Sequence, residues 1–147
     1  MLLRTTLGLP LKVSYTLDDM AEDLIGLMDA LHLDQAHLVG ASMGGMIGQI
    51  ATARNPHRVL SFTSIMSSSG DSKLPGASRK VVRTMVKRSL GIEKPNLENT
   101  MAFQRMIGSP GYPQSDGELK KKVLASVERS LHPQGYSRHL AAIMASG

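Results

Sequence analysis

The chain has 147 residues, of which 41% are hydrophobic, so it can build a core and lacks the low hydrophobicity of a disordered chain. A formal charge of +5 permits attraction to nucleic acid or anionic membranes without establishing either. The absence of cysteine excludes disulfides and thiolate chemistry, and two Phe, three Tyr and no Trp leave little to stack on bases, so we expect no nucleic-acid partner.

The start of the chain, from Met1 to Ser14, has apolar residues without a helical or strand period and is expected to be a loop. Arg4, Gly8 and Pro10 interrupt it before a signal-peptide core can develop. No apolar run in the sequence reaches the length of a membrane span. We therefore expect a cytoplasmic protein in which any membrane contact is peripheral.

A helical pattern follows from about Thr16 to Leu33. Thr16 can cap this helix and Asp19, three residues later, can complete a capping box. The apolar residues that recur at helical spacing are Leu17, Met20, Ala21, Leu24, Leu27, Met28 and Leu31. This stripe predicts a helix with one buried face.

The next stretch joins an apolar run, Ala36 to Ala41, through the pattern G-x-S-x-G to a helix from about Met43 to Arg54. A strand before the pattern and a helix after it are the context of a nucleophile elbow, a sharp turn that would hold the Ser42 hydroxyl clear of the sheet. Small residues are expected at this turn, because a side chain at position 40 or 44 would strike the neighbouring strand or helix, and Gly40, Gly44 and Gly45 meet that demand. The alternative is an ordinary tight turn in which Ser42 is idle.

A second strand is predicted from about Arg58 to Met66, which completes a strand–helix–strand unit with parallel strands. The polar loop after it, Ser67 to Ser72, would share the edge of the sheet with Ser42, where open α/β sheets place their sites. The composition shifts near Leu74, so we expect residues 1–74 to form one part and residues 75–147 a helical part. Its helices are expected at about Ala77–Leu90, Leu97–Ile107, Glu118–Leu131 and Gly135–Ser146.

Residues Tyr15 to Met66 closely resemble the centre of an α/β-hydrolase-fold serine esterase, with the nearest likeness to the carboxylesterase and aclacinomycin-methylesterase-like branch. The residues that follow, through Gly147, are similar to the helical cap of such enzymes. The resemblance implies a partial α/β-hydrolase fold, a βαβ unit with a nucleophile elbow followed by a cap-like region. It also implies that the family's first strands, its HG-type oxyanion loop and its last strand lie outside this chain.

The same resemblance assigns chemistry to two residues. It implies that Ser42 is the nucleophile and that the backbone amide of Met43 is one oxyanion donor. The family's acid and histidine follow the serine in a section for which this chain has no counterpart. The implied substrate is a small carboxylic ester, and the implied activity is weak because a serine hydroxyl without a base is a poor nucleophile.

Geometry limits which residues could replace the missing acid and base. His37 lies five residues down the strand, ~16 Å from Ser42, and His57 lies beyond a helix, on the order of 18 Å away. His32 precedes the strand and belongs at the opposite edge. His132 and His139 stay open as candidate bases and Asp71 as a candidate acid, with a helix-end residue, a solvent-facing residue and a turn former as the alternatives.

No metal or cofactor is expected, because the five histidines show neither H-x-x-x-H nor H-E-x-x-H spacing. Two strands alone cannot form a stable sheet, so either the helices wrap them or another copy adds its strands in a homo-oligomer. Two other functions stay open. The chain could be a non-catalytic fragment or interaction module of an α/β-hydrolase. Alternatively, the basic helix from Arg79 to Arg88 could contact a nucleic acid or an anionic membrane, although a solvated outer face is the simpler explanation of that helix.

Overall fold

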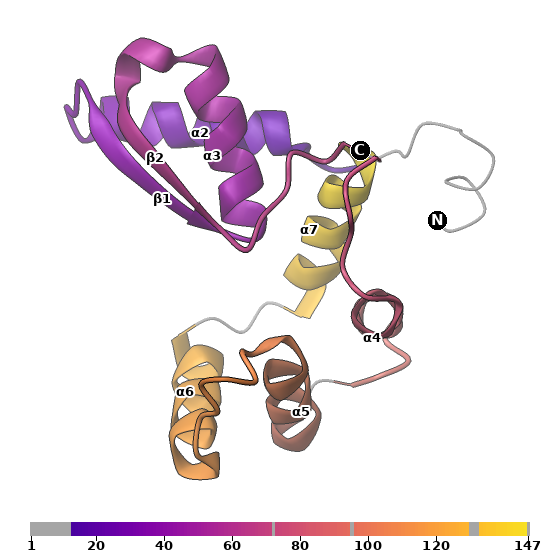
Figure 1. The fold of residues 1–147 in the computed structure, drawn as a ribbon. Coiled ribbons are helices and arrows are strands. Elements are labelled where there is room, and N and C mark those ends of the chain that lie inside the picture. Colours follow the sequence, from indigo (N-terminus) through magenta and orange to yellow (C-terminus); the bar gives the residue numbers. More distant parts are fainter. Residues whose placement is uncertain (1–12, 72, 95, 130–132, 147) are drawn as a thin grey trace. The chain divides into compact units, whose positions relative to one another are not determined.

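The computed structural model describes residues 13–71, 73–94, 96–129 and 133–146, so most of the expected N-terminal loop lies outside the described residues. The elements are α2 (Leu17–Ala30), β1 (Ala36–Ala41), α3 (Met43–Arg54), the 3-10 helix η1 (Pro56–Arg58), β2 (Val59–Ile65), α4 (Arg79–Ser89), α5 (Leu97–Ile107), α6 (Asp116–Arg129) and α7 (Pro133–Ala145) (Figure 1). They fall into two compact units. The first unit contains the residues up to Pro75 and those from Ala141 onward, and the second unit is Gly76–Leu140.

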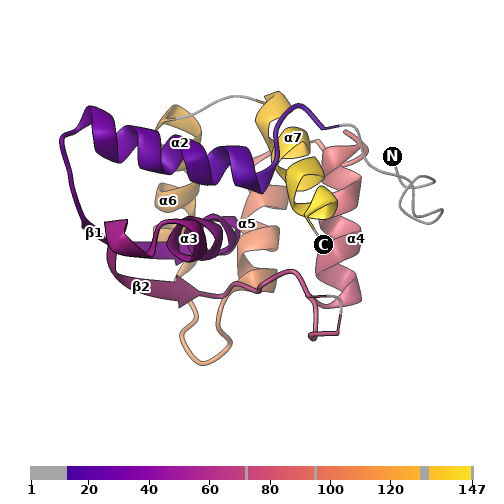
Figure 2. The same ribbon diagram turned by 90° about the horizontal axis from the view of Figure 1, so that it is seen from above.

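The sheet of the first unit consists of β1 and β2, which pair in parallel as predicted. The pairing runs from Ala36 opposite Val59 to Ala41 opposite Ile65, with one irregularity after Ala36. α3 packs on the sheet and α2 packs on α3, so the layers follow in the order sheet, α3, α2 (Figure 2). Val39 stays 71% exposed in β1, since α3 packs on the opposite face of the strand pair.

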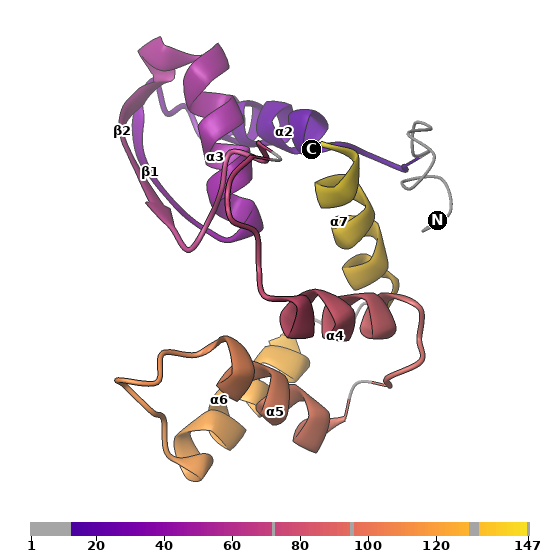
Figure 3. The ribbon, with the colours of Figure 1, turned by 45° about the vertical axis from the view of Figure 1, so that its right-hand side comes forward.

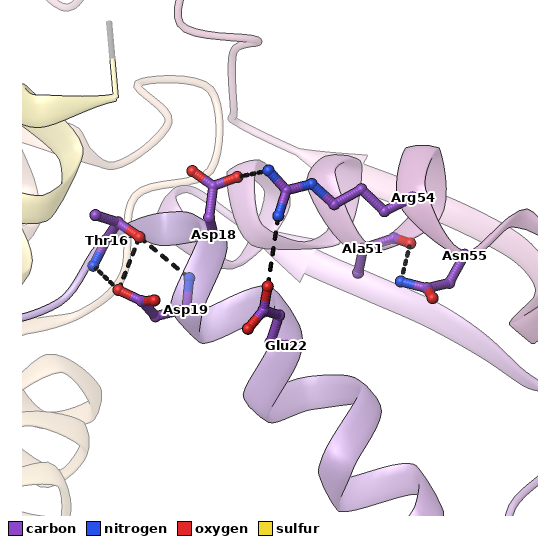
Figure 4. Close-up of polar contacts among 7 residues, drawn as sticks. All are labelled: Thr16, Asp18, Asp19, Glu22, Ala51, Arg54 and Asn55. Carbon is purple, nitrogen blue, oxygen red and sulfur yellow. Dashed lines mark hydrogen bonds and ion pairs between the residues drawn. The ribbon is translucent and has the colours of Figure 1, made fainter.

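The start of α2 confirms the predicted capping box (Figure 4). The Thr16 hydroxyl accepts a hydrogen bond of 3.1 Å from the Asp19 amide, and the Asp19 carboxylate accepts one of 2.7 Å from the Thr16 amide. These bonds favour the charged carboxylate, so they lower the pKa of Asp19. The helix ends at Ala30 rather than Leu33, because the chain reverses at His32, whose φ is 55°.

Two arginines of the first unit make ion pairs and differ in their exposure to solvent. Arg54 reaches Asp18 and Glu22 on α2 (Figure 4), but its side chain is 52% exposed. The side chain of Arg58 is only 18% exposed. Arg58 donates hydrogen bonds to the carbonyls of Asp34 (2.7 Å) and Leu33 (2.9 Å) and to the carboxylate of Asp29 (2.7 Å), so it ties the start of β2 to the loop before β1.

Truncation of these two arginines should therefore have unequal effects on stability. Arg58→Ala is expected to lower the free energy of unfolding by about 2–3 kcal/mol, because it leaves two loop carbonyls without their charge-assisted donor. Arg54→Ala should cost less than about 1 kcal/mol, as solvent-exposed ion pairs do. Urea unfolding followed by circular dichroism measures both, and equal losses would contradict the anchoring role of Arg58.

The second unit is helical and is shown in Figure 3. α5 packs against α4 and α6, and the buried residues of α6 are Leu119 and Val123. Arg88 of α4 lies with its guanidinium 4.5 Å from the centre of the Phe103 ring. It also pairs with Glu93 at 3.2 Å and donates a hydrogen bond of 2.6 Å to the carbonyl of Asn99, which fastens α4 to α5.

The predicted helices of this region are confirmed with small differences at their ends. α5 has the predicted bounds, whereas α6 begins two residues earlier because the Ser115 hydroxyl and the Glu118 carboxylate form a capping pair before it. Hydrogen bonds from the hydroxyl and amide of Ser115 lower the pKa of Glu118. Among the described residues, none of the helices is both long enough and apolar enough to cross a membrane.

Candidate active site

Ser42 lies between the last residue of β1 and the first residue of α3, at the bend where the chain changes from strand to helix. Its backbone has φ 52° and ψ −120°, a conformation that L residues rarely adopt. Such a conformation costs on the order of 1–3 kcal/mol and persists only where the surroundings enforce it. Backbone strain of this kind clusters at functional sites, so the strained and exposed Ser42 marks the bend as a candidate site.

Hydrogen bonds hold the backbone of Ser42 on both sides. Its amide donates to the carbonyl of Ile65 in β2 at 2.9 Å. Its carbonyl accepts from the amides of Gly45 (2.9 Å) and Met46 (3.2 Å) and from the hydroxyl of Ser67 (2.8 Å). The strained conformation is therefore fixed both by the first turn of α3 and by the end of β2.

The glycines around Ser42 let the backbones approach one another. A Cβ atom at Gly40 would lie 2.3 Å from the carbonyl oxygen of Gly44, and one at Gly45 would lie 2.5 Å from the Cβ atom of Ser67. These contacts confirm the need for glycine at position 40. The same expectation is wrong for Gly44, because a Cβ atom there would meet nothing within 4 Å.

The polar groups at the bend are the hydroxyl of Ser42 and the amides that begin α3. Within the described residues, the Ser42 side chain is exposed and caps no amide of α3. Met43 is the first residue of the helix, so its amide has no acceptor inside α3. The start of a helix carries partial positive charge, so this amide can stabilise a negative oxygen placed beside the serine.

The structure does not place Asp71 as an acid beside a base. The residue is exposed in the loop after β2, and its carboxylate accepts a hydrogen bond of 2.9 Å from the amide of Lys73. This is the turn-forming arrangement that the sequence offered as the alternative. Of the two candidate bases, His132 lies outside the described residues, and His139 is an exposed residue of α7 in the second unit.

The other three histidines lie away from the bend, as the strand geometry predicted. The Nδ1 atom of His37 is 2.8 Å from the hydroxyl of Ser61 on the neighbouring strand. His57 lies in η1, before β2, where its carbonyl accepts a hydrogen bond of 2.8 Å from Gln35. His32 follows α2. In the described part of the first unit, the bend thus brings together a serine and helix amides, without the acid and base of a triad.

Ser67 is the site residue that the sequence analysis did not single out. It stood in the predicted polar loop at the right edge of the sheet, but nothing in that run of serines distinguishes the one that reaches Ser42. The bond joins residues 25 positions apart. A polar residue directly after the second strand of a βαβ unit is the only local signal that could have pointed to it.

A cavity of about 220 Å³ lies in the first unit, beside β1. Its lining is formed by Leu24, Leu38, Val39, Gly40, Gly44, Ile47, Gly48 and Phe62. The lining is apolar and includes the two glycines of the G-x-S-x-G pattern but not Ser42. A Cβ atom at Gly48 would lie 2.4 Å from the Phe62 ring, so this glycine sets the distance between α3 and the sheet.

The first unit has two parallel strands that are joined in the chain by a helix, and a strained serine lies where the first strand turns into that helix. This arrangement is typical of α/β proteins that present a serine at the edge of the sheet. The comparison with known families gives the finer statement. Residues 6–105 match the family model of the alpha/beta hydrolase fold. The chain belongs to the α/β-hydrolase fold family, as its sequence resemblance predicted.

The relatives with related sequences include enzymes that are named for ester chemistry. The chain is 26% identical over 129 residues to a rhodomycin D methylesterase of Streptomyces sp. strain C5, covering 75% of this chain and 43% of that protein. It is 28% identical over 109 residues to a 3-oxoadipate enol-lactonase of Acinetobacter baylyi, covering 74% of this chain and 38% of the relative. The chain thus spans less than half of the length of these relatives.

Solved structures confirm the fold. A hydrolase from Pseudomonas aeruginosa superposes with a TM-score of 0.58 at 22% identity, covering 92% of this chain and 48% of that one. The N-acyl homoserine lactone degrading enzyme Est816 superposes with a TM-score of 0.56 at 20% identity, covering 90% of this chain and 50% of that one. The chain therefore has a partial α/β-hydrolase fold.

Proposed function

We propose that the protein is a serine hydrolase of small carboxylic esters, with Ser42 as nucleophile and the Met43 amide as an oxyanion donor. The observation that carries this proposal is the exposed Ser42 at the bend, held at φ 52° with its side chain unused as a helix cap. The names of the methylesterase and enol-lactonase relatives point to the same class of bond.

In the proposed reaction, the Ser42 hydroxyl oxygen attacks the carbonyl carbon of the ester. The carbonyl electrons move to oxygen, where the Met43 amide at the positive end of α3 stabilises the charge. Collapse of this intermediate expels the alcohol, which takes up a proton, and water then hydrolyses the acyl-serine to release the acid. The described part of the first unit holds no base beside Ser42, so we propose that solvent accepts the serine proton, and we expect a low rate.

We also propose that residues 1–74 are the part of the α/β-hydrolase core that carries Ser42 and that residues 75–147 are the helical cap-like region of the family. The cap-like region contains four methionines, Met85, Met101, Met106 and Met144, whose side chains are flexible and apolar. We place the protein in the cytoplasm, and we propose neither metal nor cofactor in the reaction.

Turnover of p-nitrophenyl acetate by the 147-residue chain tests the proposal. We expect slow hydrolysis that exceeds the buffer rate in proportion to protein concentration, and no hydrolysis of p-nitrophenyl phosphate, which has the same leaving group but no carbonyl. Absence of ester turnover above the buffer rate would contradict the hydrolase proposal. That result would favour the alternative of a non-catalytic fragment or interaction module. The described residues of the first unit, which place no acid and base beside Ser42, support this alternative.

The uncovered strands support a proposal on assembly. In the described residues β1 and β2 pair only with each other, so each has one edge of unpaired amides and carbonyls. Three apolar residues of these strands are about half exposed or more, namely Val39 (71%), Leu60 (54%) and Ile65 (49%). We propose that a second copy of the chain adds its strands to this sheet, giving a homo-oligomer.

Light scattering on a size-exclusion column should accordingly report a dimer or a larger assembly. Val39→Lys is expected to shift the mass at least partly to the monomer, because a charge in the edge strand disfavours strand addition. The control Leu31→Lys changes a residue that is 59% exposed but lies after α2, outside the sheet, and should leave the assembly unchanged. A monomeric wild-type chain would refute this proposal.

A further inference from the structure

The residue that reaches Ser42 from the neighbouring strand is Ser67. Ile65, the last residue of β2, accepts the hydrogen bond from the Ser42 amide at 2.9 Å, and two residues later the Ser67 hydroxyl donates to the Ser42 carbonyl at 2.8 Å. Between these two residues, Met66 has a φ of 49°, a left-handed conformation that residues other than glycine seldom adopt. The end of β2 is thus turned so that it holds both backbone groups of Ser42.

Space for Ser67 is kept open by Gly45. A Cβ atom at position 45 would lie 2.5 Å from the Cβ and 2.6 Å from the hydroxyl oxygen of Ser67, so any side chain there would push Ser67 away. The Gln49 side chain adds a second link, since its amide nitrogen is 3.2 Å from the carbonyl of Gly45 and 3.1 Å from that of Ser68. The loop after β2 is therefore bonded to α3 at two points.

The carbonyl of Ser42 and the amide of Met43 belong to one planar peptide group. A hydrogen bond that fixes the orientation of the carbonyl also fixes the direction in which the amide points. A bond donated to the carbonyl oxygen also polarises the group, which makes its N–H a stronger donor. Ser67 thus bonds to the carbonyl end of the peptide group whose other end is the Met43 amide.

We propose that Ser67 is a positioning residue that orients and polarises the Ser42–Met43 peptide, so that its amide can stabilise the oxyanion of the ester reaction. This inference rests on the proposed function. It assigns to Ser67 no contact with the substrate. It predicts an effect on the rate of the chemical step rather than on substrate binding, because the oxyanion forms only after the ground-state complex.

The test is Ser67→Ala, measured by turnover of p-nitrophenyl acetate and by the rate of covalent inactivation with a fluorophosphonate. Loss of a complete oxyanion donor typically costs 10²–10³ in rate, so loss of its orientation should lower both rates about tenfold, with KM changed little. Ser68→Ala is the matched control, since Ser68 is an exposed neighbour whose hydroxyl accepts a bond from the amide of Gly70 (3.3 Å) and not from the bend. Ser68→Ala should retain the wild-type rates.

A second pair separates orientation from folding. Ser67→Thr keeps a hydroxyl and should keep most of the activity. Ser67→Val introduces a side chain of the same shape as threonine but without the hydroxyl, and it should be as slow as Ser67→Ala. Two results would overturn the inference: equal rates for the Thr and Val variants, or a fluorophosphonate inactivation rate of Ser67→Ala that equals the wild-type rate. If the wild-type chain reacts with fluorophosphonate no faster than Ser42→Ala does, the proposed function fails instead, so the two failures are distinguishable.

Discussion

Ser42→Ala should abolish reaction with fluorophosphonates and reduce p-nitrophenyl acetate hydrolysis to the buffer rate. The reason is chemical, because the variant lacks the oxygen that forms the acyl-enzyme, and the neighbouring Ser67 hydroxyl is donated to the carbonyl of residue 42. The fold should be retained, since the hydrogen bonds at Ser42 involve its backbone amide and carbonyl and not its side chain.

This comparison needs a control for adventitious reaction of other hydroxyls. Ser68→Ala removes an exposed serine of the same edge of the sheet and should leave labelling and turnover at the wild-type level. Circular dichroism of each variant checks that the folded state is unchanged. Turnover that survives Ser42→Ala would remove this residue from the mechanism, and equal loss in both serine variants would assign the effect to the loop rather than to the hydroxyl of Ser42.

Gly40→Ala is expected to destabilise the first unit strongly. The added Cβ atom would lie 2.3 Å from the carbonyl oxygen and 2.5 Å from the carbonyl carbon of Gly44. Both are backbone atoms that cannot move without shifting α3 away from β1. Because overpacking against side chains already costs about 1–3 kcal/mol, this backbone clash should lower the free energy of unfolding by more than about 3 kcal/mol.

The second glycine of the same pattern supplies the matched control. Gly44→Ala adds a methyl where nothing lies within 4 Å, and it replaces glycine in the first turn of α3. It should be neutral or raise stability by up to about 1 kcal/mol, the usual gain in helix propensity. Urea unfolding measures the change in the free energy of unfolding of both variants. Similar losses in the two would mean that the chain needs flexibility throughout the bend rather than close approach at Gly40.

Local patterns predicted much of the fold. The strand bounds of β1, the start of α3 and the capping box at Thr16 follow from apolar runs, a glycine-rich turn and paired polar residues a few positions apart. The end of α2 was placed too late, because apolar residues continue past Ala30 while the turn at His32 depends on the path to β1. Periodicity alone does not contain that information.

The site was less accessible from the sequence. The G-x-S-x-G pattern predicted the position of Ser42, and the structure adds the strain and the backbone bonds that hold it. Which glycine is needed depends on atoms brought together by folding, so Gly44 was misjudged while Gly45 proved to contact Ser67. Ser67 itself was missed for the same reason, since the hydrogen bond to Ser42 spans 25 positions.

The assignment of Ser42 as nucleophile is tested most directly by locating the adduct after reaction with a fluorophosphonate. Tryptic digestion releases Ser42 within residues 13–54, because no lysine or arginine lies between Lys12 and Arg54. Tandem mass spectrometry of this peptide should place a single modification on Ser42 in the folded wild-type protein, and none after denaturation before labelling. An unmodified Ser42, or an adduct confined to other residues, would contradict the account.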